Sequence, residues 1–81
     1  MEENMQAVIP LDQLPVGSFG RVTLLRATGA IRRRMQDLGL VPGTQVEAVH
    51  RSPAGDPTAY CIRGAMIALR QDDAHQVLVA F

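Results

Sequence analysis

The chain has 81 residues, of which 47% are hydrophobic, and eight arginines balance eight acidic residues to a formal net charge of zero. This length and composition are typical of one small globular domain and argue against a disordered chain. The balanced charge argues against a nucleic-acid-binding protein, and no window is long and apolar enough for a membrane helix. The single cysteine cannot form an internal disulfide, which favours a reducing, cytoplasmic setting.

The N-terminal half predicts a lead-in, a turn and a strand. We expect residues 1–8 to be a flexible lead-in to one domain over residues 9–81. Residues 10–15 (PLDQLP) are bounded by prolines and predict a single turn. Residues 19–26 (FGRVTLLR) are rich in β-branched and large apolar residues, which predicts a strand. Its period of two places Val22 and Leu24 on one face, and Thr23 and Leu25 on the other.

The next segment predicts a short helix. In residues 30–38 (AIRRRMQDL), Ile31, Met35 and Leu38 recur at helical spacing and would share one apolar face. Gly39 stands where a left-handed residue would end the helix, and Pro42 prevents its continuation. A helix this short is unstable alone in water, so we expect it to pack on a sheet.

The C-terminal half predicts four more strands, at residues 44–51, 58–63, 66–70 and 77–80. Residues 52–57 (SPAGDP) have turn chemistry and join the first two strands into a hairpin. A tight reversal at residues 63–65 and one helical turn at residues 71–75 connect the others. The predicted fold is mainly β, a small bent barrel of about five short strands with one short α-helix after the first strand, because closure protects strand edges.

Few residues are candidates for chemistry. Asp72 and His75 would share a face of one helical turn, as a divalent-metal site could use. The alternative is a capped turn, in which an aspartate accepts backbone N–H groups and His75 favours the C-terminal end. One carboxylate and one imidazole are too few for a protein metal site, so further ligands would have to come from elsewhere. Cys61 lies within a strand, and we expect it to be a packed structural residue.

The densest charge is the triple Arg32-Arg33-Arg34, on the helix face away from the apolar residues. It is either a solvated face or a grip for carboxylates or phosphates on a partner. No nucleophile motif of the G-x-S-x-G type occurs, and a Walker loop is excluded because the chain has no lysine. From the residues alone we expect a non-enzymatic protein that works by contact.

Four segments, in order and at their spacing, resemble the FeoA (ferrous iron transport protein A) family of small cytoplasmic proteins. They are LDQLPVGSFGRV at residues 11–22, IRRRMQDLGLVPGTQVE at 31–47, SPAGDPTAYCIRG at 52–64 and ALRQDDA at 68–74. The resemblance implies an SH3-like barrel, related to the C-terminal domain of metal-dependent repressors. It also implies an accessory role in bacterial ferrous iron uptake, by contact with the cytoplasmic GTP-binding portion of the membrane transporter FeoB.

On this resemblance we expect residues 30–43, with the loop at residues 52–57 as a second candidate, to dock on the transporter. The candidate contacts are Arg32, Arg33, Arg34, Leu40, Pro42, Pro53 and Asp56. The alternative function is a metal-responsive or metal-delivering module, with Asp72 and His75 as its metal residues. We expect no tightly held cofactor, and leave open a weakly bound divalent transition metal. The chain is expected to be a monomer or weak homo-oligomer that neither binds nucleic acid nor inserts into the membrane.

Overall fold

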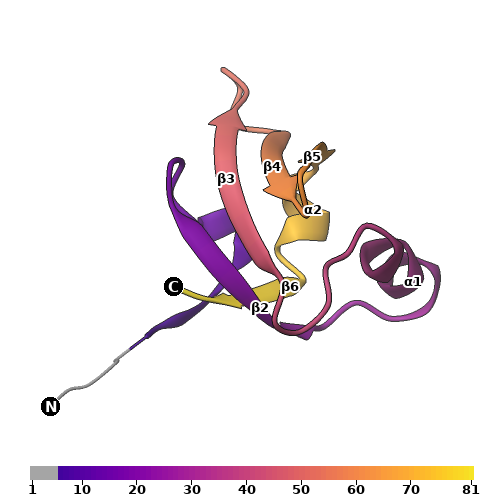
Figure 1. The fold of residues 1–81 in the computed structure, drawn as a ribbon. Helices are drawn as coiled ribbons and strands as arrows, with labels where there is room; N and C mark the ends of the chain where they lie inside the picture. Colours follow the sequence, from indigo (N-terminus) through magenta and orange to yellow (C-terminus); the bar gives the residue numbers. More distant parts are fainter. Residues whose placement is uncertain (1–5) are drawn as a thin grey trace, which may run out of the picture.

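In the computed structural model, which describes residues 6–81, the backbone forms one six-stranded antiparallel sheet and three short helical segments (Figure 1). The strands are β1 (Val8–Pro10), β2 (Phe19–Leu25), β3 (Gln45–Arg51), β4 (Thr58–Ile62), β5 (Ala65–Leu69) and β6 (Val77–Ala80). The helical segments are the 3₁₀ turn η1 (Leu11–Gln13) and the α-helices α1 (Gly29–Asp37) and α2 (Gln71–Ala74). Among the described residues, no helix is long and apolar enough to cross a membrane.

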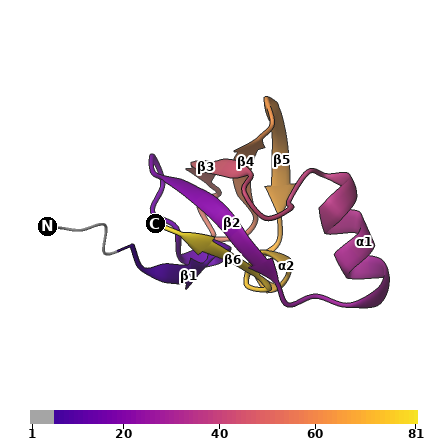
Figure 2. The same cartoon turned by 60° about the horizontal axis from the view of Figure 1, so that its bottom comes forward.

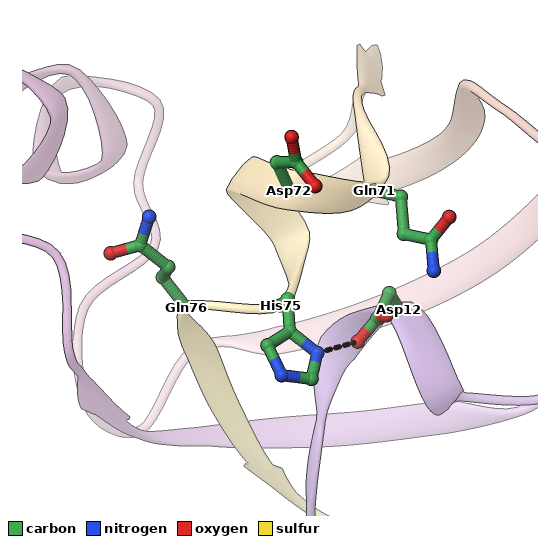
Figure 3. Close-up of a pocket in the computed structure, with 5 residues that line it drawn as sticks. All are labelled: Asp12, Gln71, Asp72, His75 and Gln76. Atoms are coloured by element: carbon green, nitrogen blue, oxygen red, sulfur yellow. Dashed lines mark hydrogen bonds and ion pairs between the residues drawn. The ribbon is translucent and has the colours of Figure 1, made fainter.

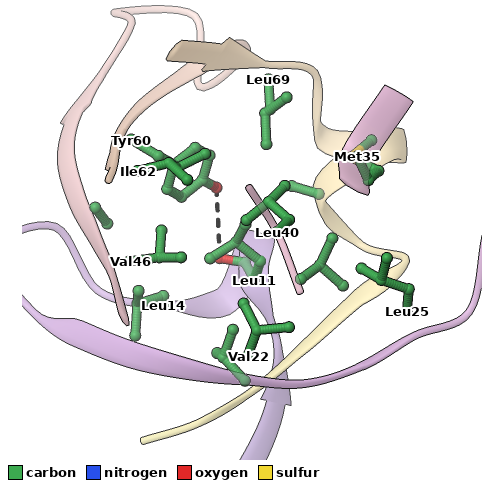
Figure 4. Close-up of a cluster of buried hydrophobic side chains, with 14 residues drawn as sticks. Leu11, Leu14, Val22, Leu25, Met35, Leu40, Val46, Tyr60, Ile62 and Leu69 are labelled. Carbon is green, nitrogen blue, oxygen red and sulfur yellow. Dashed lines mark hydrogen bonds between the residues drawn. The ribbon is translucent and has the colours of Figure 1, made fainter. Parts of the chain in front are cut away.

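The sheet has the strand order β1-β6-β2-β3-β4-β5 and curls around one hydrophobic core (Figures 1 and 4). The predicted mainly β fold is confirmed, with six strands instead of about five. The additional strand, β1, pairs with β6 through three residues, and three residues are too few for a periodic pattern. It begins at Val8, inside the segment that we expected to be a lead-in, whereas residues 1–5 lie outside the described residues. The core consists of Leu11, Leu14, Val22, Leu25, Met35, Leu40, Val46, Ala48, Tyr60, Ile62, Leu69, Ala74, Val77 and Val79.

Strand β2 departs from the predicted alternation. Val22 and Leu25 are buried, whereas Leu24 is 50% exposed. The pairing of β2 with β6 shifts register between Val22 and Leu24, so that Thr23 is the extra residue of a β-bulge. The prediction that Val22 and Leu24 share a face was wrong, because the bulge exchanges the two faces of the strand after Val22.

Helix α1 lies to one side of the sheet, at the end away from β1 (Figure 2). It ends as predicted: Gly39 has φ +96°, and the Leu40 N–H donates to the Met35 carbonyl at 3.0 Å, which is a Schellman motif. Met35 and Leu40 are fully buried and Leu38 is partly buried. Ile31 is 42% exposed, so only the C-terminal part of the predicted apolar face packs on the core.

Both predicted hairpins are present. Residues 52–57 connect β3 to β4, and the two-residue loop Arg63-Gly64 connects β4 to β5. Arg63 and Gly64 both have positive φ, +52° and +86°, as a type I′ turn requires. Tyr60 and Ile62 point into the core, whereas Cys61, which we expected to be a packed structural residue, lies on the opposite face of β4 and is half-buried.

Candidate docking surface and the α2 junction

The four-residue helix α2 is the point at which distant segments of the chain meet. The backbone N–H of Gln71, at its start, donates to Asp56 Oδ1 of the β3–β4 loop at 2.9 Å. Arg34 Nη1 of α1 lies 3.4 Å from Asp73 Oδ2. The predicted docking segments, α1 and the residue 52–57 loop, are therefore both attached to α2.

The C-terminal end of α2 is attached to η1. His75 Nδ1 lies 3.0 Å from Asp12 Oδ1 (Figure 3), and the Asp12 side chain is only 7% exposed whereas that of His75 is 56% exposed. Arg51 Nη2 donates to the Asp12 carbonyl at 3.4 Å. The Tyr60 hydroxyl donates to the Leu11 carbonyl, also at 3.4 Å (Figure 4), and burial raises the pKa of this phenol. The first of these contacts joins η1 to α2, and the other two join η1 to β3 and β4.

Asp72 and His75, the predicted metal residues, do not converge. Figure 3 shows the Asp72 carboxylate pointing away from the His75 ring, which turns toward Asp12 instead. The two side chains point apart although His75, the C-terminal cap of α2, keeps helical backbone angles of φ −62° and ψ −22°. Within residues 6–81, no group of three or more His, Cys, Asp or Glu side chains could hold a metal ion.

A carboxylate does cap the start of α2, as the capped-turn alternative expects, but the capping residue is a different one. The side chain that accepts the first N–H of α2 is Asp56, 15 residues earlier in the chain, and not an aspartate of the turn itself. An acidic side chain at this end of a helix also interacts favourably with the helix dipole. Asp56 therefore links the β3–β4 loop to α2 and does not merely shape its own turn.

The three predicted arginines have different surroundings. Arg32 Nη1 donates to the Leu25 carbonyl at 3.1 Å and so ties α1 to the end of β2. Arg34 pairs with Asp73, as described above. Arg33 is exposed, and its guanidinium makes no hydrogen bond or ion pair with the rest of the described chain. Of the three, Arg33 is the side chain most available to a partner.

The other predicted contacts divide by burial. Leu40 is fully buried beneath the end of α1, so it cannot be a surface contact in this structure. It was predicted as part of the docking segment at residues 30–43, but the Schellman motif turns it inward beside Met35. Pro42 and Pro53 are exposed, and Asp56 is partly buried and already bonded to α2.

Sequence reasoning missed three residues of the α2 junction: Asp12, Arg51 and Gln71. Asp12 and His75 are 63 residues apart, and no local pattern connects them. The one available signal was Asp12 itself, an acidic residue between the two leucines of a proline-bounded turn (PLDQLP). Leu11 and Leu14 are both buried, and this burial carries Asp12 against the barrel.

The curled six-stranded antiparallel sheet with short connections defines a small barrel of the SH3-like class. Besides its strands, the barrel carries α1, between β2 and β3, and the α2 junction. The chain belongs to the FeoA domain family, whose model matches residues 9–80.

Solved structures of FeoA proteins share this fold. The FeoA protein of Chlorobium tepidum is 33% identical, with a TM-score of 0.84 over 90% of this chain and 70% of that protein. The FeoA protein of Stenotrophomonas maltophilia, a prokaryotic SH3 domain protein crystallised with zinc, is 31% identical. Its TM-score is 0.76, over 94% of this chain and 89% of that protein.

A curated relative combines this domain with a transporter. It is the Fe(2+) transport protein A/Fe(2+) transporter FeoB fusion protein of Porphyromonas gingivalis, 29% identical over 69 residues. The match covers 85% of this chain but only 8% of the fusion protein. The chain therefore corresponds to a small part of that protein.

Proposed function

We propose that the chain is an accessory protein of bacterial ferrous iron uptake. It acts in the cytoplasm by binding the GTP-binding portion of a FeoB-type membrane transporter, and it catalyses no reaction of its own. The observation that carries this proposal is the P. gingivalis fusion, in which a related segment and a FeoB transporter share one polypeptide. A covalent link raises the effective concentration of two modules that work in contact, so the fusion supports a direct interaction.

The surface of α1 supports a role in docking. Arg32 and Arg34 hold the helix to β2 and α2, and Arg33 remains exposed between them. A guanidinium recognises carboxylates and phosphates through two parallel hydrogen bonds. We therefore assign the first contact with the transporter to Arg33, with the exposed Pro42 and Pro53 as further contacts.

The test is a pull-down, followed by titration, with the soluble GTP-binding portion of FeoB from the same organism. Arg33→Glu should weaken binding roughly tenfold, the size expected for reversing one interfacial charge. Arg70→Glu, an equal charge change at an exposed site next to α2, is the control and should bind like the wild type. Unchanged binding by both Arg33→Glu and the double reversal Arg32→Glu/Arg34→Glu would contradict the arginine contact. No binding by the wild-type chain would contradict the proposed function.

A second candidate is a metal-responsive or metal-delivering module. Two observations favour it: the S. maltophilia relative was crystallised with zinc, and a hollow of this chain is lined by Asp12, Gln71, Asp72, His75 and Gln76. Asp72 would have to turn toward His75 for the two to share a divalent transition metal. Anaerobic equilibrium dialysis with Fe(II) tests this candidate. Stoichiometric binding that His75→Ala removes would support it, and no binding at physiological concentrations would dispose of it.

A further inference from the structure

Both phenylalanines of the chain lie on its surface: Phe19 is 53% exposed and Phe81 is 46% exposed. The core contains aliphatic residues, a methionine and Tyr60 in their place. Exposed aromatic residues that gather in one place mark interaction surfaces, because their burial contributes much of the binding free energy. Here they do gather: both phenylalanines line one hollow of about 160 Å³, which we call the aromatic hollow. Its lining is Gln6, Phe19, Gly20, Arg21, Gln45, Ala80 and Phe81.

The strand register places this hollow on a larger apolar face. Ala80 of β6 pairs with Val8 of β1 on one side and with Arg21 of β2 on the other. Val8 is 57% exposed, and Leu24, on the same outer side of β2 beyond the bulge, is 50% exposed. The outer face of β1, β6 and β2 therefore carries further exposed apolar side chains beside the hollow, together with Arg21.

The charge of the hollow is determined by Arg21. Its Nη1 donates to the Gly43 carbonyl at 2.8 Å, which fixes the guanidinium at this site and leaves other N–H donors free. Among the described residues that line the hollow, Arg21 has the only charged side chain. Glu47 of β3 is the cross-strand partner of Phe19. The hollow thus offers a positioned cation beside two aromatic rings.

We propose that the aromatic hollow binds a segment of a partner protein in which an aromatic or large aliphatic side chain lies next to a carboxylate. The apolar side chain packs between Phe19 and Phe81, and the carboxylate accepts hydrogen bonds from Arg21. This chemistry disfavours a second copy of the chain. A twofold pairing of the hollow would bring the two Arg21 side chains close together, and like charges across an interface are unfavourable.

The identity of the partner, the FeoB transporter, rests on the proposed function. The hollow adds a second contact surface to the one on α1. The hollow is lined by residues of β2, β3 and β6, by Phe81 and by Gln6 before β1, whereas the arginine contact lies on α1. The two surfaces can therefore be tested separately with the same probe.

The experiment maps backbone amide NMR shifts of the labelled chain during titration with the unlabelled soluble GTP-binding portion of FeoB. We expect shifts at residues 19–21 and 80–81, and at least a fivefold loss of affinity in Phe81→Ala and in Arg21→Glu. Phe81→Ala should keep the fold, because the hydrogen bonds of residue 81 to Ala7 are made by backbone groups. Met66→Ala removes an equally exposed apolar side chain, 58% exposed, from β5 outside the hollow, and should bind like the wild type.

The outcomes separate this inference from the proposed function. Binding whose shifts are confined to α1, with Phe81→Ala equal to the wild type, overturns the inference and leaves the proposed function standing. No binding at all overturns the proposed function, and with it the partner named here. A concentration-dependent dimer that Phe81→Ala abolishes would assign the hollow to a second copy and overturn the proposal. The proposal would also be overturned if deleting residues 1–5 shifted the amide signals of the hollow while the FeoB portion did not shift them.

Discussion

Replacing Gly39 with alanine tests how the end of α1 is held. Gly39 has φ +96°, and an added Cβ would lie 2.5 Å from Cδ of Arg63 in the β4–β5 turn. The left-handed backbone costs an L-residue about 1–2 kcal/mol. Displacing the flexible Arg63 side chain adds about 1 kcal/mol. We therefore expect Gly39→Ala to lower the free energy of unfolding by about 2–3 kcal/mol, from the sum of these two costs.

Urea denaturation followed by circular dichroism measures this loss, and two further variants separate its causes. In an Arg63→Ala background, Gly39→Ala should cost about 1 kcal/mol less, because the steric contact is gone. Gly39→Asn should cost less than Gly39→Ala, because asparagine tolerates the left-handed region better. A loss below about 0.5 kcal/mol for Gly39→Ala, within the range of an ordinary surface substitution, would refute the reasoning. An equal loss with and without Arg63 would refute its steric part.

Three further predictions concern the barrel and the α2 junction. Burial raises the pKa of Tyr60, the only tyrosine, above 10.0, so ultraviolet titration of tyrosinate should give a higher midpoint in the native than in the denatured protein. This contribution to stability is complete below pH about 10 and is lost as pH rises through the folded pKa; a stability that increases there would contradict it. Leu40→Ala should lower the free energy of unfolding, measured by urea denaturation, by about 2–5 kcal/mol. Ile31→Ala, at an exposed site, should lower it by less than about 1 kcal/mol, and equal losses would contradict the burial of Leu40. Asp56→Ala should lower the free energy of unfolding by about 1 kcal/mol, because the first N–H of α2 loses its acceptor. Asp72→Ala should change it by no more than about 0.5 kcal/mol, and thermal melts that rank the two variants the other way would refute the cap.

The elements with local signals could be predicted from the sequence. The end of α1 follows from a single glycine after an apolar helical pattern, and the structure has the expected left-handed residue there. The hairpin at residues 52–57 follows from its proline, glycine and aspartate, whose preferences act within a few residues.

Features that depend on distant partners could not be predicted in the same way. The bulge at Thr23 follows from how β2 pairs with β6, more than 50 residues later, as the hydrogen bond from Thr23 Oγ1 to the Leu78 carbonyl shows. The attachment of His75 to Asp12 and of Asp56 to α2 likewise depends on the closed barrel. The candidate docking residues were chosen by charge and by position beside turns. Charge does not distinguish Arg33 from Arg32 and Arg34, which bond to other parts of the chain. Position beside a turn does not distinguish the exposed Pro42 from the buried Leu40, because that difference arises only on packing.

The most direct test of the central claim is titration calorimetry of the wild-type chain against the soluble GTP-binding portion of FeoB. The proposed function predicts saturable binding at a fixed stoichiometry. If arginines make the contact, the affinity should also fall as salt is raised, because exposed charge interactions are screened. No measurable binding at any salt concentration would contradict the claim that this chain works by direct contact with the transporter.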